Sequence, residues 1–290
     1  MRNHRLLRHI STFSILTALF ALQIAPVQGA INSPLESSVE SYVKGLRRKG
    51  VIHGYERTAW VVYDFTSGKK LVSINENSQL QAASMVKPYL ALAFFHQVQA
   101  GRIIYGSASR RHMELMIQKS NNESTNWVMR QTGGPAATEA LLKKHYPALC
   151  RQLSLVEYIP SNGRTYRNKG SAADYTNFLS ALWKGQLPYS KEMLRVMALP
   201  GIDRLYYDCR HIPKGTAVYN KTGSTAMCCG DMGILVARGR NGRSYPYIVV
   251  GVIESGKRST SYGSWISRRA DVIREVSNLA YLDMKKRYPL

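Results

Sequence analysis

Residues 83–90 read ASMVKPYL, with a serine and a lysine three residues apart at the predicted start of an apolar helix. The spacing alone is a weak signal. The same Ser-x-x-Lys pattern occurs three times in the chain, at Ser41/Lys44, Ser67/Lys70 and Ser84/Lys87. A functional reading therefore depends on whether the rest of the sequence supplies partners for one of the three pairs.

Two of the three pairs have a structural explanation. Residues 33–49 begin with SPLE and carry apolar residues at helical spacing, which predicts a packing helix with Ser33 as its N-cap and Glu36 completing a capping box. That helix contains the first pair. The second pair lies on the turn TSGK between AWVVYDF and KLVSINEN, which predict a β-hairpin. Only Ser84 and Lys87 are left without such an explanation.

The order of the predicted elements indicates the fold class. Patterns from residue 84 to residue 199 are helical, whereas TAVYNKTG, DMGILVARG and SYPYIVVGVIES predict three strands, followed by a closing helix over residues 265–286. Strands at both ends predict a mixed α/β fold of the α+β type, with an antiparallel sheet flanked by terminal helices and an inserted all-helical domain. We expect residues 30–80 and 213–290 to form the sheet domain and residues 81–212 the helical domain, with a cleft between them.

The first 29 residues are typical of a secretory signal peptide. Arg2, Arg5 and Arg8 precede a short apolar stretch, and small residues follow it up to Gly29. An uncleaved membrane anchor is the alternative, but the apolar run is shorter than the roughly 20 residues that a span needs. We therefore expect a periplasmic or secreted protein.

The chain is strongly basic, with a formal net charge of +22. Such a charge attracts polyanions, which in an exported protein means the cell wall, acidic lipids or anionic small substrates. The lysines and arginines are scattered along the sequence, which favours a dispersed basic surface over a dedicated patch. We expect a monomer with no nucleic-acid partner, and leave open a contact with peptidoglycan.

The four cysteines, Cys150, Cys209, Cys228 and Cys229, make disulfides plausible in an oxidising compartment. A bond from Cys209 to either of the last two would tie together the flanks of the segment around Lys221. A zinc site is poorly supported, because the chain has no CxxC and its histidines are scattered. We expect no metal and no cofactor.

Ser84 and Lys87 have the spacing that nucleophilic catalysis needs. Positions i and i+3 of a helix share a face, about 5–6 Å apart at Cβ. A serine hydroxyl is a poor nucleophile until a base takes its proton, and a lysine can act as that base where burial favours its neutral form. Two later segments supply partners: Ser120-Asn121-Asn122 after an amphipathic helix, and Lys221-Thr222-Gly223-Ser224 on a predicted strand.

These three motifs, in this order, resemble the class A β-lactamase-like group of the penicillin-recognising serine hydrolases. The resemblance covers nearly all of the chain after the leader. It implies that Ser84 is the acylated nucleophile, with Lys87 as its base or base partner. It also implies that Ser120 relays a proton to the leaving nitrogen and that Asn122 holds the substrate amide.

The same resemblance assigns the substrate carboxylate to the KTGS segment. Lys221, Thr222 and Ser224, with Gly223 between them, form this binding segment, and the backbone N–H groups of Ser84 and Ser224 form the oxyanion hole.

Two departures from the group's pattern bear on function. Only 36 residues separate Ser84 from Ser120, so a loop at one rim of the cleft is shortened. The segment expected to hold the deacylating carboxylate reads VEYIPSNGRTYRN and lacks the usual Glu-x-x-Leu-Asn. Glu157 is its acidic residue, with Asn162 five residues on. Either Glu157 positions the hydrolytic water, or it is a solvated loop carboxylate paired with Arg164 or Arg167.

The leading hypothesis is an exported serine hydrolase that opens β-lactam rings through a Ser84 acyl-enzyme. A D-Ala-D-Ala carboxypeptidase-like peptidoglycan hydrolase would use the same acylation chemistry on a peptide substrate. A non-catalytic cell-wall-binding protein on the same scaffold is the third hypothesis. The basic charge favours it, but a binding module would not need all three motifs intact.

Overall fold

The computed structural model describes residues 33–160 and 167–290. The expected signal peptide at residues 1–29 lies outside the described residues, as does Asn162. Within the two described ranges, no helix combines the length and the apolar character that crossing a membrane requires.

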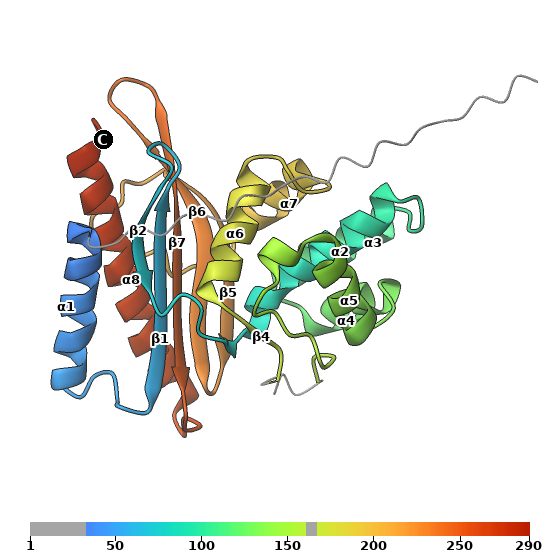
Figure 1. The fold of residues 1–290 in the computed structure, drawn as a ribbon, viewed down its shortest axis with the longest axis horizontal. Coiled ribbons are helices and arrows are strands. Elements are labelled where there is room, and N and C mark those ends of the chain that lie inside the picture. Colours follow the sequence, from blue (N-terminus) through green and yellow to red (C-terminus); the bar gives the residue numbers. More distant parts are fainter. Residues whose placement is uncertain (1–32, 161–166) are drawn as a thin grey trace, which may run out of the picture.

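A five-stranded antiparallel sheet forms the centre of the molecule, in the order β2-β1-β7-β6-β5 (Figure 1). The N-terminal hairpin is joined to the C-terminal strands through the pairing of β1 with β7, so both ends of the chain build one sheet. The strands are β1 (Glu56–Asp64), β2 (Lys69–Ile74), β5 (Ala217–Thr225), β6 (Cys228–Arg238) and β7 (Ser244–Ser255).

The terminal helices α1 (Pro34–Arg48) and α8 (Tyr262–Arg287) lie side by side on one face of this sheet (Figure 1). Ser33 caps α1 as predicted, since its side chain accepts a hydrogen bond from Glu36 N at 3.0 Å. The predicted capping box is nevertheless incomplete. The Glu36 carboxylate accepts from Ser73 N of β2 at 2.6 Å, which ties the helix to the sheet instead of closing its own first turn.

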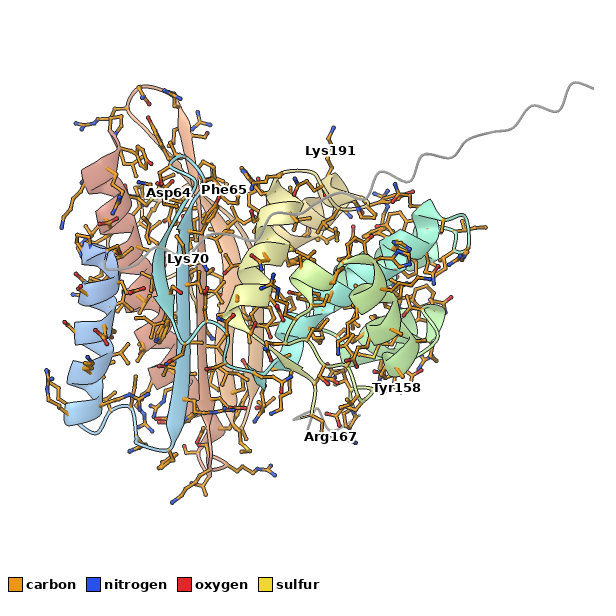
Figure 2. The ribbon with its side chains drawn as sticks, in the orientation of Figure 1. Asp64, Phe65, Lys70, Tyr158, Arg167 and Lys191 are labelled. Atoms are coloured by element: carbon orange, nitrogen blue, oxygen red, sulfur yellow. The ribbon has the colours of Figure 1, made fainter. Side chains whose placement is uncertain are left out.

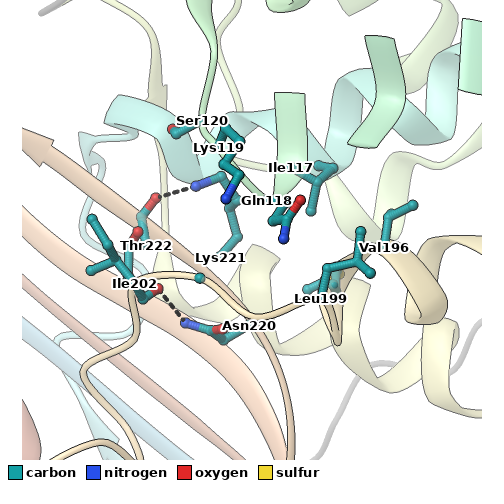
Figure 3. A pocket seen from close by; sticks show the side chains of 12 residues that line it. Ile117, Gln118, Lys119, Ser120, Val196, Leu199, Ile202, Asn220, Lys221 and Thr222 are labelled. Carbon is teal, nitrogen blue, oxygen red and sulfur yellow. Dashed lines mark hydrogen bonds between the residues drawn. The ribbon is translucent and has the colours of Figure 1, made fainter. Parts of the chain in front are cut away.

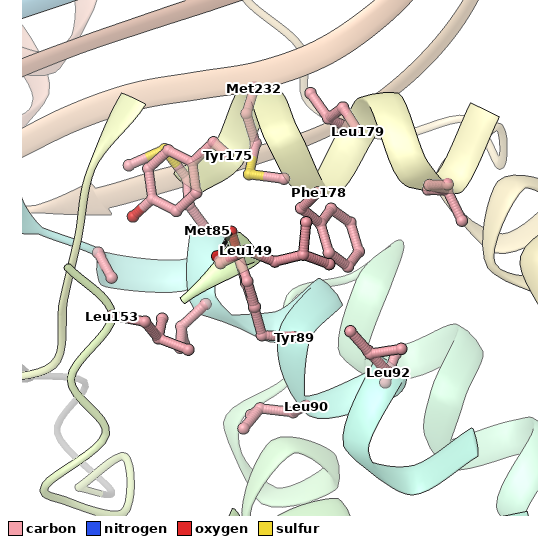
Figure 4. Close-up of a cluster of buried hydrophobic side chains, with 14 of the residues drawn as sticks. Met85, Tyr89, Leu90, Leu92, Leu149, Leu153, Tyr175, Phe178, Leu179 and Met232 are labelled. Carbon is pink, nitrogen blue, oxygen red and sulfur yellow. Dashed lines mark hydrogen bonds between the residues drawn. The ribbon is translucent and has the colours of Figure 1, made fainter. Parts of the chain in front are cut away.

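The helical region covers the opposite face of the sheet (Figure 1). Its central element is α2, whose residues 87–95 are all buried, and Figure 4 shows the surrounding cluster of Met85, Tyr89 and Phe178. A helix buried on all sides is typical of a domain core. The helices of this region are α2 (Lys87–Gln99), α3 (Ser107–Ile117), α4 (Asn122–Gln131), α5 (Pro135–His145), α6 (Ala172–Trp183) and α7 (Ser190–Met197), with a 3₁₀ turn η2 (Pro147–Leu149).

The sequence did not predict a second, two-stranded sheet beside these helices. Strand β3 (Leu80–Gln81) pairs with β4 (Lys169–Gly170), and the next residue, Ala82, donates its N–H to Asn168 O at 2.9 Å. The expected all-helical domain thus contains a short ladder, placed directly before Ser84. The domain limits of 81 and 212 stay a prediction.

The expected disulfides are absent from the described structure, where all four cysteines are free thiols. Cys228 and Cys229 are consecutive strand residues, so their side chains point to opposite faces of the sheet. Cys228 Sγ contacts Gln81 O at 3.3 Å on the helical side. Cys229 and Cys209 contact carbonyls eight residues apart on α8, those of Ile266 and Arg274, which is about 12 Å along a helix. That separation explains why the two do not bond.

Candidate active site

Ser84 lies on the short 3₁₀ helix η1 (Ala83–Val86), which leads directly into α2. Ala83 has a φ of +45°, one of five positive values at non-glycine residues in the described chain. A side chain in that region strains the backbone, and such strain persists only where the surroundings enforce it. Ser84 is half-buried, and no described residue hydrogen-bonds its hydroxyl. The hydroxyl is therefore accessible and uncommitted.

Glycines on two strands allow η1 to lie against the sheet. A Cβ on Gly223 would come within 3.0 Å of Ala82 O and 3.2 Å of Ala83 Cβ. On the neighbouring strand, a Cβ on Gly230 would meet the Met85 side chain at 2.6 Å. Gly223 of the KTGS segment thus acts by packing: its missing side chain brings the segment of Ser84 up to β5.

Lys87 joins the first motif to the second. Its Nζ lies within hydrogen-bond distance of Ser120 O at 2.6 Å, Ser120 Oγ at 3.0 Å and Asn122 Oδ1 at 3.1 Å. The Lys87 side chain is fully buried. Burial, followed by the charge of Lys221, lowers the pKa of Lys87 well below its ordinary value. The structure therefore favours the neutral amine that a base requires.

Ser120 lies between the end of α3 and the start of α4, with a φ of +54°. Asn121 caps α4, since its side chain accepts from Ser124 N at 2.7 Å. This turn brings both Ser120 and Asn122 within hydrogen-bond distance of the Lys87 amine. Figure 3 shows Ser120 above Lys221, and both line one cavity.

The KTGS segment lies on β5, at the edge of the sheet. Lys221 is 3% exposed and donates to Thr222 O at 3.0 Å. Burial lowers the pKa of Lys221 to about 8, although the nearby carboxylate of Asp231 favours its charge. At neutral pH this lysine is still mostly cationic, as binding a carboxylate requires.

Arg204 and Asp231 belong to this site but were missed by sequence reasoning. Arg204 Nη2 donates to Ser224 Oγ at 2.6 Å and Nη1 to Gly230 O at 3.0 Å. The Asp231 carboxylate accepts from Arg204 N at 2.7 Å and from Asn220 at 3.0 Å. Burial raises the pKa of Asp231 to about 7. No motif distinguishes Arg204 among the 40 lysines and arginines of the chain.

Within the described residues, the hydrogen bonds of Glu157 do not reach Ser84, Ser120 or Lys221. Its carboxylate accepts from Arg167 N at 3.0 Å, and no hydrogen bond or ion pair links it to Lys87 in the described structure. Ile159, two residues on, is tied to the helix that carries Asn122. Asn126, one turn after Asn122 on α4, donates to Ile159 O at 2.7 Å and accepts from Ile159 N at 2.8 Å. The structure thus holds an apolar residue, 3% exposed, one helical turn from the Lys87 contacts.

This fold, with a serine and a buried lysine set beside a KTG strand, defines a β-lactamase-like serine hydrolase. A model of the Beta-lactamase enzyme family matches residues 46–106 and 109–282. The chain therefore belongs to the Beta-lactamase enzyme family, which confirms the resemblance inferred from its motifs. No curated protein matches the chain.

Solved structures confirm the predicted fold. PBP-A matches with a TM-score of 0.71 at 18% identity, covering 90% of this chain and 100% of that one. A leucine-to-glutamate variant of PBP-A, in an acyl-enzyme complex with penicillin G, matches with a TM-score of 0.69 at 19% identity over 90% and 99%. A β-lactamase from Streptosporangium roseum has a TM-score of 0.66 at 16% identity over 86% and 99%.

Proposed function

We propose that this protein opens β-lactam rings by transferring the acyl group to Ser84. The observation that carries the proposal is the set of three contacts that hold the buried Lys87 amine between Ser120 and Asn122. A neutral amine has two hydrogens and one lone pair. It can donate to the Ser120 carbonyl and the Asn122 amide oxygen, and still accept the proton of a hydroxyl.

The acylation step then balances within these residues. Ser84 Oγ attacks the lactam carbonyl carbon while its proton passes to Lys87. The C–N bond of the lactam breaks, and the nitrogen receives a proton from Ser120, which Lys87 in turn resupplies. Asn122 holds the acyl amide, and Lys221, Thr222 and Ser224 hold the carboxylate of the substrate. Arg204 orients the Ser224 hydroxyl through its 2.6 Å hydrogen bond.

The fate of the acyl group separates two functions. A β-lactamase must hydrolyse the acyl-enzyme, for which Glu157 is the predicted carboxylate. A peptidase-like, penicillin-binding protein stays acylated. The second function is supported by Ile159, because an apolar side chain held by Asn126 cannot activate water. It is also supported by the likeness to PBP-A, a variant of which has been captured as a penicillin G acyl-enzyme. The peptide counterpart of this chemistry is cleavage of a D-Ala-D-Ala bond.

We further propose that the protein acts as a monomer outside the cytoplasm, after removal of residues 1–29. The basic and apolar segments of the leader support export. The net charge of +22, which is still about +19 without the three arginines of the leader, supports contact with anionic wall material.

Mixing the purified mature protein with benzylpenicillin tests the proposal. Intact mass follows the adduct, and loss of lactam absorbance follows turnover. We expect an adduct of one penicillin mass that Ser84→Ala lacks. Turnover supports the lactamase, and a persistent adduct supports the penicillin-binding protein. No adduct under any condition would contradict both.

Glu157→Gln then tests the role of the loop carboxylate. If Glu157 positions the hydrolytic water, the variant accumulates the acyl-enzyme, and its turnover of benzylpenicillin falls by at least tenfold. An adduct lifetime equal to that of the wild type would remove Glu157 from the mechanism.

A further inference from the structure

A second cation, Lys119, lines the cavity beside the KTGS segment. This cavity has a volume of about 40 Å³ and extends from Ser120 and Lys221 to the loop around Leu199. Figure 3 shows the Lys119 side chain directed into it, toward Lys221. None of the motifs uses Lys119, which lies one residue before Ser120.

The wall of this cavity leaves the charge of Lys119 uncompensated. Of the twelve described residues that line it, two are lysines and none is acidic. The carboxylate near Lys221, that of Asp231, is already bound to Arg204 N and Asn220. Within the described chain Lys119 makes no ion pair, and its side chain is exposed. A ligand in the cavity therefore meets the ammonium groups of Lys119 and Lys221, and the carboxylate that compensates this charge is that of Asp231 alone.

The walls that present Lys119 are held in place. Gln118 donates from its side chain to Pro200 O at 3.0 Å, which ties the end of α3 to the loop across the cavity. At Gly201 a Cβ would lie 3.2 Å from Gln118 O, so the glycine lets the two walls approach each other. Ile202, 74% exposed, adds an apolar surface at the same cavity. An anionic group on an aliphatic stem fits this combination of an apolar surface and a free ammonium.

We propose that Lys119 binds a second carboxylate on the leaving-group side of the substrate. The inference rests on the proposed function, in which Lys221, Thr222 and Ser224 hold the first carboxylate. The substrate class is then an acyl-D-alanyl peptide whose terminal D-residue carries an acidic side chain on an aliphatic stem. Its α-carboxylate binds the KTGS segment, its stem packs on Ile202, and its side-chain carboxylate pairs with Lys119.

Competition for Ser84 labelling tests the proposal without requiring turnover of a peptide. A fluorescent penicillin labels the full mature protein in the presence of acetyl-D-alanyl-D-glutamate or acetyl-D-alanyl-D-glutamine, which differ by one charge. We expect the glutamate peptide to protect at a concentration two- to fivefold lower, about the effect of a partly exposed ion pair. This preference should shrink as salt is added.

Variants then assign the preference to one residue. Lys119→Met should bring the ratio of the two peptides to about one, whereas Lys119→Arg should keep it. Lys191→Met is the matched control, since Lys191 is exposed on α7 and points away from the molecule in Figure 2. It should leave the ratio as in the wild type. Because the ratio is taken within each variant, a general loss of labelling does not affect it.

The outcomes separate the two proposals. Labelling with no preference, a preference that survives in Lys119→Met, or no protection by either peptide would overturn the role of Lys119 and leave acylation standing. Failure of penicillin to label Ser84 at all would overturn the proposed function, and the inference with it.

Discussion

Lys87 and Lys221 are two buried lysines with opposite requirements. Burial is the main cause that lowers the pKa of both, but the nearby charge of Lys221 lowers the pKa of Lys87 further, whereas the carboxylate of Asp231 favours the charge of Lys221. One amine can therefore be neutral and act as the base while the other stays cationic and binds a carboxylate. Two identical side chains thus suit different roles, because their surroundings shift their pKa values differently.

The pKa of about 8 at Lys221 predicts how acylation depends on pH. A lysine is charged below its pKa, so the cation proposed to bind the substrate carboxylate is present at pH 7 and is lost as the pH rises through about 8. The second-order rate constant for acylation by benzylpenicillin reports the free enzyme. It should therefore fall about tenfold for each unit above pH 8.

Lys221→Arg provides the control for the predicted decline above pH 8, because a guanidinium does not titrate in that range. The variant should react more slowly at pH 7 but without the decline above pH 8. A wild-type rate constant that stays level up to pH 10 would contradict the assignment of the charge to Lys221.

The position of Ile159 indicates where a carboxylate would speed deacylation. Asn126 hydrogen-bonds both the N–H and the carbonyl of Ile159, one helical turn after Asn122, whereas the Glu157 carboxylate accepts from Arg167 N. Ile159→Glu should shorten the lifetime of the penicillin adduct at least tenfold, measured by the decay of the acyl-enzyme mass. Burying a carboxylate also destabilises the fold, so circular dichroism must show that the variant is folded.

Ile159→Leu is the matched control for this change and should keep the lifetime of the wild type. An Ile159→Glu protein that folds and acylates but deacylates no faster would show that water does not reach position 159.

Contact between η1 and β5 positions Ser84, the proposed nucleophile, and Gly223 permits this contact. Gly223→Ala would place a methyl group 3.0 Å from Ala82 O, so η1 must move away from the strand. We expect the rate of Ser84 labelling to fall at least tenfold, with little change at distant elements. Gly263→Ala is the control, since a Cβ there meets nothing within 4 Å on an exposed turn of α8. Equal labelling rates in the two variants would contradict a positioning role for Gly223.

Elements with a strong local signal could be predicted from the sequence. Periodicity and caps gave α1, the β1–β2 hairpin and the three C-terminal strands, because those patterns depend on residues near in the chain. Long-range contacts could not be predicted. The β3–β4 ladder joins strands of only two residues each. The Glu36 side chain accepts a hydrogen bond from Ser73 N instead of completing the capping box of its own helix. The three Ser-x-x-Lys pairs could be told apart from the sequence by the motifs that follow Ser84 and Lys87. The hydrogen bond from Arg204 to Ser224 could not be predicted, because it depends on how the loop that carries Arg204 folds.

Two hydrophobic clusters, one on each face of the sheet, form the core of the described chain. One lies under the helical region around α2, and the other lies between the sheet and the terminal helices. A buried ion pair crosses the second cluster, where Arg269 of α8 donates to Glu56 of β1 at 2.8 and 2.6 Å. Its side chains are 2% and 0% exposed. This pair fixes α8 to the strand that joins the two ends of the chain.

Arg269→Met should destabilise the whole protein, because it leaves the Glu56 carboxylate buried without its counter-charge. Breaking a buried pair in this way costs about 3–5 kcal/mol, measured as the free energy of unfolding in urea. The variant Glu56→Gln/Arg269→Met should recover part of that loss, since no charge remains to be compensated. Lys44→Met is the matched control: it breaks the exposed Lys44–Glu40 pair on α1, where we expect a change within about 1 kcal/mol. If Arg269→Met cost no more than this control, α8 would be held by its apolar contacts alone.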